Sequence, residues 1–124
     1  MKAIVITQPG AAEVLLLQDR PKPIAQAGEV LIKVKATAVN RADVLQRMGR
    51  YPAPPGVVAD IPGMEYSGIV EELGTAVQSI KIGDRVYGLV AGGSYAEYLA
   101  VDARLVAKIP DRLSYVEAAA SLPL

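Results

Sequence analysis

The alternation of apolar and polar residues is clearest from Glu29 to Thr37, where it predicts a β-strand. Because successive side chains of a strand point to opposite sides, this segment should have one buried and one exposed face. The buried face is expected to consist of Val30, Ile32, Val34 and Ala36, and the mostly polar exposed face of Leu31, Lys33, Lys35 and Thr37. Shorter apolar or β-branched runs predict further strands at Lys2 to Ile6, Val14 to Gln18, Ser67 to Leu73, Arg85 to Val90, Ser94 to Val101 and Leu105 to Ile109.

Glycine and proline residues separate these predicted strands. Turn residues occur at Pro9-Gly10, Gly28-Glu29 and Gly92-Gly93, and Gly83-Asp84 predicts a hairpin or a tight turn. The eleven glycines and nine prolines would break a helical bundle, whereas a sandwich or barrel of short strands accommodates them. The pattern therefore predicts a mainly β fold with short helices.

Two short helices are predicted by their capping residues. Asn40 is a favoured N-cap and Asp43 lies three residues later, as in a capping box. Apolar residues then recur at helical spacing, and Gly49 is placed to end this helix. Ser114 and Glu117 form the same kind of box, so a second helix should begin near residue 114. We expect residues 114–124 to be the start of a helix that connects to a further domain.

Composition limits the chemistry that the chain can perform. Its 124 residues are the size of one domain, and 13 basic residues balance 13 acidic ones, so net charge favours neither nucleic acid nor an anionic membrane. The sequence has no cysteine and no histidine, which excludes disulfides, thiol nucleophiles, histidine-based triads and zinc sites built from these residues. No apolar run approaches the ~20 residues of a membrane-spanning helix. The first residues do not resemble a secretory signal, so we expect a cytoplasmic location.

A proline-rich loop follows the first predicted helix. It carries one aromatic residue, Tyr51, among Pro52, Pro54, Pro55 and Pro62, and it ends within residues 63–68, where a strand is expected to begin. The carboxylate of Glu65, in this segment, is expected to be buried. A polar helix start, a stiff loop with a tyrosine and a buried carboxylate are typical of one wall of a cleft. They do not by themselves identify a reaction.

Six short motifs occur in a recognisable order along almost the whole chain. They are MKAI (1–4), GEVLIKV (28–34), NRAD (40–43), PGMEYSG (62–68), GDRVYG (83–88) and YAEY (95–98). This succession resembles the N-terminal, GroES-like catalytic domain of the medium-chain dehydrogenase/reductase superfamily. Within it, the chain is most similar to the zinc-free NADPH quinone oxidoreductases of the zeta-crystallin type and their inducible relatives.

The resemblance implies a partly open β-barrel over residues 1–124, packed in the full-length protein against a Rossmann domain that binds the nicotinamide cofactor. The sequence has no G-x-G-x-x-G opening a helix, and Gly92-Gly93 lies between predicted strands. We therefore expect the main NADPH site to lie in that other domain. The expected partners are this Rossmann domain in cis, a small-molecule quinone or enone and, for the full-length protein, a second copy in a homodimer.

The chain departs from the zinc alcohol dehydrogenases of this superfamily at both catalytic zinc ligands. Asn40 stands where they have a cysteine, and Met64 stands where they have the histidine of a G-H-E motif. An amide and a thioether do not replace thiolate and imidazole as zinc ligands, so no metal is expected. Without a Lewis acid, alcohol oxidation loses its means of stabilising an alkoxide. Hydride transfer to a quinone or conjugated enone needs less help, and hydrogen-bond donors near the developing oxyanion would suffice.

The resemblance also implies roles for individual residues. Asn40 would lie at the base of the substrate pocket near the nicotinamide and hold the acceptor's oxygen or the cofactor, or it is purely an N-cap. Tyr51 would line the cleft and donate its hydroxyl to acceptor or cofactor, or it covers the barrel as a loop aromatic. Gln46 either faces the cleft or lies on the exposed side of the helix. Met64 would fill the vacated zinc position as packing and contact the substrate there, while Glu65 is expected to be structural.

Three functions remain open at this point. The first is the substrate-binding half of an NADPH-dependent oxidoreductase that reduces quinones or conjugated enones without zinc and is inactive in isolation. The second is an enoyl-thioester reductase of the same superfamily. The third is a stand-alone GroES-like binding module, although no segment of the sequence resembles a mobile partner-binding loop.

Overall fold

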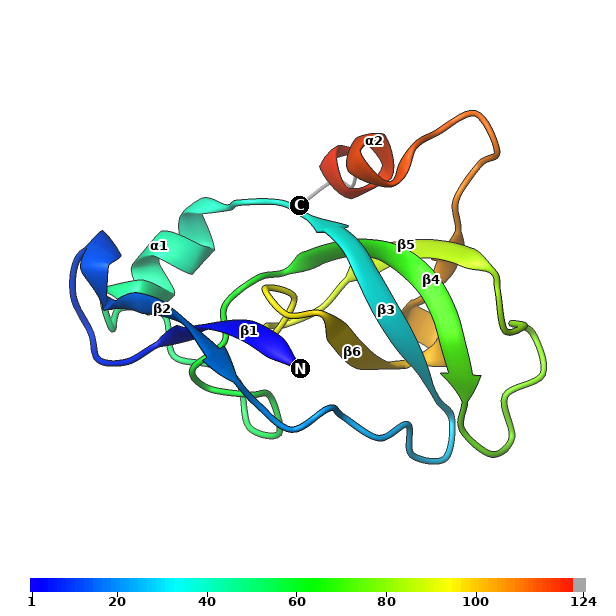
Figure 1. Cartoon of the computed structure of the whole chain (residues 1–124), viewed down its shortest axis with the longest axis horizontal. Coiled ribbons are helices and arrows are strands. Elements are labelled where there is room, and N and C mark those ends of the chain that lie inside the picture. Colours follow the sequence, from blue (N-terminus) through cyan, green and yellow to red (C-terminus); the bar gives the residue numbers. More distant parts are fainter. Residues whose placement is uncertain (122–124) are drawn as a thin grey trace.

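The computed structural model describes residues 1–121 (Figure 1). The last three residues of the predicted connecting helix lie outside this range. Strands predominate, which confirms the mainly β prediction, and the two α-helices are short. The elements are β1 (Lys2–Ile6), the 3₁₀ helix η1 (Ala12–Val14), β2 (Leu15–Asp19), β3 (Glu29–Thr37), α1 (Arg41–Arg47), β4 (Glu65–Leu73), β5 (Arg85–Leu89), β6 (Tyr98–Asp102), the 3₁₀ helix η2 (Ala103–Leu105), β7 (Ala107–Lys108) and α2 (Tyr115–Ala120).

The strands form two antiparallel sheets that do not close into a complete barrel. Five strands pair in the order β6-β3-β4-β5-β7, and β1 pairs with β2 in a separate two-stranded sheet. Figure 1 shows β1 and β2 beside the larger sheet, with α1 at one end and α2 across the far end of β3. The two sheets meet where the Ile4 N–H donates to the Tyr95 carbonyl at 2.9 Å and Ala3 bridges Ala96.

Strand β3 has the predicted bounds, but its two faces differ less than the alternation predicts. Val30 and Ile32 are completely buried, as expected. Leu31, expected on the exposed face, is only 1% exposed, so this part of the prediction is wrong. The pairing of β3 with β4 shifts register between Leu31 and Ile32. The residue skipped by this shift, Glu71, lies on β4, so the alternation along β3 is unbroken there and both faces of β3 are covered around Leu31.

Other strand predictions differ from the structure at their ends. The strand predicted from Ser94 begins only at Tyr98, because residues 94–97 turn to contact β1 before they join the sheet. The strand predicted from Leu105 is reduced to β7, because Leu105 belongs to η2. Gly83 and Asp84 do form a tight turn, in which the Asp84 N–H donates to the Lys81 carbonyl at 3.1 Å.

The main core is formed mostly by side chains of β3, β4, β5 and β6 in the large sheet. Its buried members are Val30, Ile32, Tyr66, Val70, Ile80, Val86, Leu99 and Val101. The largest of these, Tyr66, is fully buried and its hydroxyl donates to the Leu105 carbonyl at 3.2 Å. A smaller cluster of Ala3, Val5 and Ile61 joins the two-stranded sheet to the segment that leads into β4, with Tyr95 packed against it.

Helix α2 begins as the sequence predicts and is anchored to the sheet by polar contacts. The Glu117 N–H donates to Ser114 Oγ at 3.1 Å, and the Ser114 N–H donates to the Glu117 carboxylate at 2.9 Å. Ser67 on β4 donates its hydroxyl to the Tyr115 carbonyl at 2.6 Å. Arg85 on β5 lies over the Tyr115 ring, 4.7 Å from its centroid. The first turns of α2 are therefore held against β4 and β5.

Candidate functional site

The candidate site is built around the start of helix α1. Asn40 has an extended backbone and precedes the first helical residue, which confirms the predicted N-cap position. Its N–H donates to Asp43 Oδ2 at 2.9 Å, and its side chain faces the Asp43 N–H without forming a hydrogen bond of standard geometry. The amide nitrogen Nδ2 of Asn40 is buried and has no hydrogen-bond partner within residues 1–121. The start of α1 thus holds a buried donor that the described chain does not use.

The carboxylate of Asp43 is the second component of this site. It is only 5% exposed, and its Oδ2 atom also accepts a hydrogen bond from the Tyr95 hydroxyl at 2.7 Å. Burial, together with this hydrogen bond, raises the pKa of Tyr95, so the phenol stays protonated and acts as a donor. The other oxygen, Oδ1, is buried and unpaired in the part of the chain that the structure describes. Asp43 therefore ties the helix start to a residue 52 positions away.

The segment that leads into β4 is fixed by backbone contacts with residues 94 and 95. The Tyr95 N–H donates to the Pro62 carbonyl at 3.0 Å, and the Ser94 N–H donates to the Gly63 carbonyl at 3.2 Å. Gly63 has a φ of +110°, a conformation that residues with a side chain rarely adopt. A side chain here would also collide with Ser94 and Tyr95. Glycine is therefore required next to Met64 for two separate reasons.

A buried hydroxyl pair lies next to this segment. Thr37 Oγ1 donates to the Glu65 carbonyl at 2.6 Å and lies 2.7 Å from Ser94 Oγ, and Ser94 is only 1% exposed. These bonds join the end of β3 to the start of β4. Glu65 is 4% exposed, which confirms that its carboxylate is in a buried setting.

The four predicted site residues make separate contacts in the domain. Gln46 donates its side-chain amide to the Ala59 carbonyl at 3.2 Å, so it ties α1 to the following loop. Tyr51 is 43% exposed on that loop. Met64 is half-buried, and its carbonyl accepts a hydrogen bond from the Val90 N–H at 2.8 Å.

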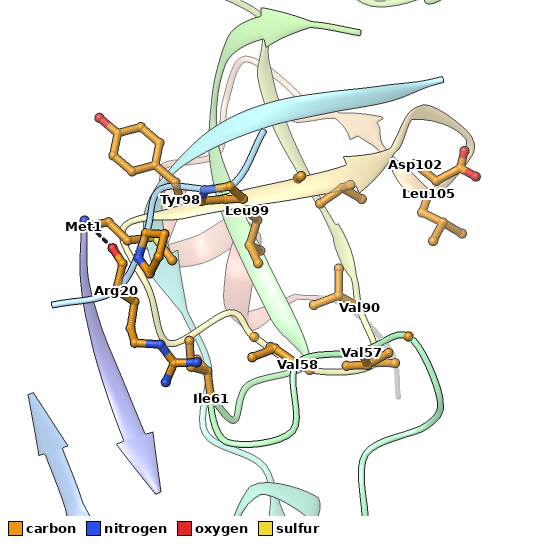
Figure 2. A pocket seen from close by; sticks show the side chains of 18 residues that line it. Met1, Arg20, Val57, Val58, Ile61, Val90, Tyr98, Leu99, Asp102 and Leu105 are labelled. Atoms are coloured by element: carbon orange, nitrogen blue, oxygen red, sulfur yellow. Dashed lines mark hydrogen bonds between the residues drawn. The ribbon is translucent and has the colours of Figure 1, made fainter. Parts of the chain in front are cut away.

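A mostly apolar cleft of about 520 Å³ is lined in part by the loop that follows Tyr51 (Figure 2). Its lining includes Val57, Val58, Ile61, Val90, Leu99 and Leu105, and none of Asn40, Gln46, Tyr51 and Met64. Two charged side chains that line it are paired, and the Met1 ammonium, which also lines it, donates to the Arg20 carbonyl at 2.8 Å. Arg20 binds Asp60 at 2.8 Å, and Asp102 binds Arg104 at 2.7 Å. The volume is typical of a small-molecule pocket, and the lining favours an uncharged molecule.

The Gly92-Gly93 pair, at the edge of this cleft, is not a phosphate-binding loop. The Gly93 N–H donates to the Ile61 carbonyl at 2.9 Å, so this amide is already used. The pair lies between β5 and β6 instead of opening a helix, as the sequence predicts. Over residues 1–121, no group of three or more acidic, cysteine or histidine side chains is arranged to hold a metal ion. None of the helices in this range is long and apolar enough to cross a membrane.

Sequence reasoning missed Tyr95, Ser94 and Thr37 as parts of the site. Tyr95 belongs to the YAEY motif, but nothing local to residues 95–98 indicates a contact with residue 43. The sequence signal that could have suggested a polar network is the capping carboxylate itself. A buried carboxylate needs several donors, and one backbone N–H does not satisfy it.

The unclosed antiparallel sheets, with a short helix between β3 and β4, define a GroES-like domain. Residues 26–111 match the alcohol dehydrogenase GroES-like domain, and the chain belongs to this family. It corresponds to the N-terminal domain of medium-chain dehydrogenases/reductases of the quinone oxidoreductase and VAT-1 type. This confirms the family that the sequence motifs indicate.

The similarity to several relatives extends over almost the entire chain. The synaptic vesicle membrane protein VAT-1 homolog-like of Mus musculus is 41% identical, over 97% of this chain and 28% of that protein. The 2-methylene-furan-3-one reductase of Solanum lycopersicum is 39% identical, over 100% of this chain and 34% of that enzyme. The crystal structure of Escherichia coli quinone oxidoreductase complexed with NADPH superposes with a TM-score of 0.87 at 33% identity, over 98% of this chain and 37% of that one. The chain thus spans about a third of the length of these relatives.

Proposed function

We propose that this chain is the substrate-binding half of an NADPH-dependent oxidoreductase that reduces quinones or conjugated enones without zinc. The other half would be a Rossmann domain in the same full-length protein, in the cytoplasm. The observation that carries the proposal is the buried Asn40 Nδ2 donor, which has no partner in the described residues and stands where zinc-dependent members have a metal ligand. The names of two relatives, a quinone oxidoreductase and a furanone reductase, support this choice of acceptor.

The chemistry requires little from this domain beyond binding and charge stabilisation. Bound NADPH supplies the hydride, and negative charge then develops on the acceptor's carbonyl oxygen. A positioned donor such as Asn40 Nδ2 stabilises that oxygen, and one such donor in a dry site contributes about 10²–10³-fold to the rate. Tyr51, whose side chain is 43% exposed, would supply a second donor from the loop once the other domain closes the site.

The apolar cleft beside the loop supports an uncharged, largely apolar acceptor. Val90 lines the cleft, and its N–H is bonded to the Met64 carbonyl. Gln46 is bonded to the Ala59 carbonyl, next to the cleft residue Val58. Met64 is therefore hydrogen-bonded to a residue that lines the cleft, and Gln46 to the chain neighbour of another. In this arrangement Met64 packs against the reacting part of the acceptor, and the cleft receives its apolar remainder.

The first test replaces Asn40 with serine in the full-length protein. Serine caps a helix about as well as asparagine but lacks the amide donor, so the fold should be preserved. We expect kcat/KM for a quinone or enone to fall by about 10²-fold, the effect of losing one such donor. Leu17→Ala, at a site that is 65% exposed on β2, is the control and should leave kcat/KM unchanged. An Asn40→Ser variant with normal kinetics would refute the role of Asn40.

The second test concerns the identity of the acceptor and the location of the main NADPH site in the Rossmann domain. Quinones, enones and enoyl thioesters are compared as substrates of the full-length protein. Preferential reduction of the thioester would replace the proposal with an enoyl-thioester reductase. NADPH is also titrated into residues 1–124 alone by calorimetry. We expect no binding at micromolar concentrations, and micromolar affinity would contradict the assignment of the main cofactor site to another domain.

A further inference from the structure

One carboxylate oxygen of Asp43 connects the start of helix α1 to Tyr95, in the segment that precedes β6. Asp43 Oδ2 accepts from the Asn40 N–H at 2.9 Å and from the Tyr95 hydroxyl at 2.7 Å. Both donors converge on the same atom of a side chain that is 5% exposed. Because charge-assisted hydrogen bonds are short and strong, they restrict the rotation of the carboxylate. The orientation of Asp43, and with it the backbone at Asn40, therefore depends on where the Tyr95 hydroxyl lies.

Tyr95 is itself held from three sides. Its N–H donates to the Pro62 carbonyl at 3.0 Å, and its carbonyl accepts from the Ile4 N–H at 2.9 Å. Its ring lies so close to Gly63 that a methyl group built there would come within 2.5 Å of Cδ1. The hydroxyl therefore has a defined position, set by β1 and by the segment that leads into β4.

We propose that Tyr95 is a positioning residue that acts through Asp43 to hold the backbone of Asn40, and thereby the side chain that carries Nδ2. This inference rests on the proposed function, in which Asn40 Nδ2 contacts the acceptor or the nicotinamide. Tyr95 is not a catalytic residue, because its hydroxyl is already committed to Asp43. The raised pKa of Tyr95 keeps its proton on the hydroxyl at neutral pH, so the phenol remains a donor there.

The experiment compares Tyr95→Phe with Tyr66→Phe in the full-length protein. Both variants remove one phenolic hydroxyl that donates a hydrogen bond, but Tyr66 belongs to the main core and its hydroxyl bonds the backbone carbonyl of Leu105 in η2. A merely structural role would therefore make the two variants alike. Two quantities are measured: kcat and KM for the acceptor, and the rate of amide hydrogen exchange at Asn40, followed by mass spectrometry of a peptide that contains it.

We expect Tyr95→Phe to lower kcat by about 10-fold or more with little change in KM, because a misplaced donor acts on the transition state. Exchange at Asn40 should become about 10-fold faster, since its carboxylate acceptor is no longer fixed. Tyr66→Phe should change neither quantity. Equal kcat values in the two variants, or an unchanged exchange rate at Asn40 in Tyr95→Phe, would overturn the proposal.

The same measurements separate this proposal from the proposed function. If the wild-type protein reduces no acceptor, the proposed function fails, and the exchange rate still decides whether Tyr95 holds Asn40. If Asn40→Ser loses activity while Tyr95→Phe keeps normal kcat and normal exchange, the proposed function stands and the positioning role is refuted.

Discussion

Replacing Gly63 with alanine should destabilise the domain more than the same change at any open turn. Gly63 joins Pro62 to Met64 at a φ of +110°, and its carbonyl accepts the Ser94 N–H. A Cβ atom here would lie 2.5 Å from Tyr95 Cδ1 and 2.9 Å from Tyr95 N. Carbon atoms pack at about 3.5–4.0 Å, so the ring or the backbone must move by about 1 Å.

The magnitude follows from two separate terms. Holding a residue other than glycine at such a φ costs about 1–3 kcal/mol. Overpacking a closed site costs a further 1–3 kcal/mol or so. The total of about 2–6 kcal/mol is a large part of the ~5–15 kcal/mol by which a domain is stable. Gly56 provides the control, since its φ is +84° and no atom lies within 4 Å of a Cβ placed there. Gly56→Ala should therefore lower the free energy of unfolding only by the conformational cost of the positive φ.

Urea denaturation of the two variants measures this difference directly. We expect the free energy of unfolding to be lower in Gly63→Ala than in Gly56→Ala by at least about 1 kcal/mol, the lower limit of the overpacking term. Equal decreases in the free energy of unfolding would show that Tyr95 and Ser94 can move aside at no cost, and the steric argument would be wrong. In the full-length protein, Gly63→Ala should also lower kcat, because displacing the Tyr95 ring withdraws its hydroxyl from Asp43.

The remaining predictions concern helix α2 and the rim of the cleft. Ser114→Ala removes the oxygen that caps α2 and should lower the free energy of unfolding by about 0.5–2 kcal/mol in urea, whereas Ser79→Ala should not. Arg85→Met removes a donor to the Leu113 carbonyl at 2.6 Å and should cost about 1.5–3 kcal/mol in the same assay. Hydrogen bonds from Arg104 lower the pKa of Asp102 to about 2, so its stabilising charge should be lost only as pH falls through that value. Carboxyl NMR titration should show this pKa, and Arg104→Gln should return it towards the ordinary range.

The sequence predicts those parts of the fold that depend on neighbours along the chain. The capping boxes at Asn40 and Ser114 place both helix starts correctly, because a cap is satisfied by a residue three positions later. Strands β1 and β3 are also predicted with the right bounds. Leu31 is the exception within β3, since the covering of a second face depends on residues from elsewhere in the chain.

The candidate site depends on contacts that no local pattern contains. Tyr95 and Asp43 are 52 residues apart, and their bond requires that two sheets meet at β1. The contact made by Gln46 is likewise not predictable from the local sequence. Its position on α1 is compatible with a cleft or with solvent, and only the path of the following loop gives it the Ala59 carbonyl as a partner. Residue types at the site can thus be read from the chain, but not their pairing.

Helix capping alone does not explain why residue 40 is an asparagine. Serine would cap α1 about as well and would not bury an amide nitrogen that has no partner in residues 1–121. An unsatisfied buried donor costs about 1–3 kcal/mol, which folding does not recover. The Asn40→Ser variant should therefore be no less stable than wild type in urea, even though its activity falls. Stability retained while activity is lost is the relation expected of a binding group, whereas a parallel loss of both would make Asn40 a structural residue.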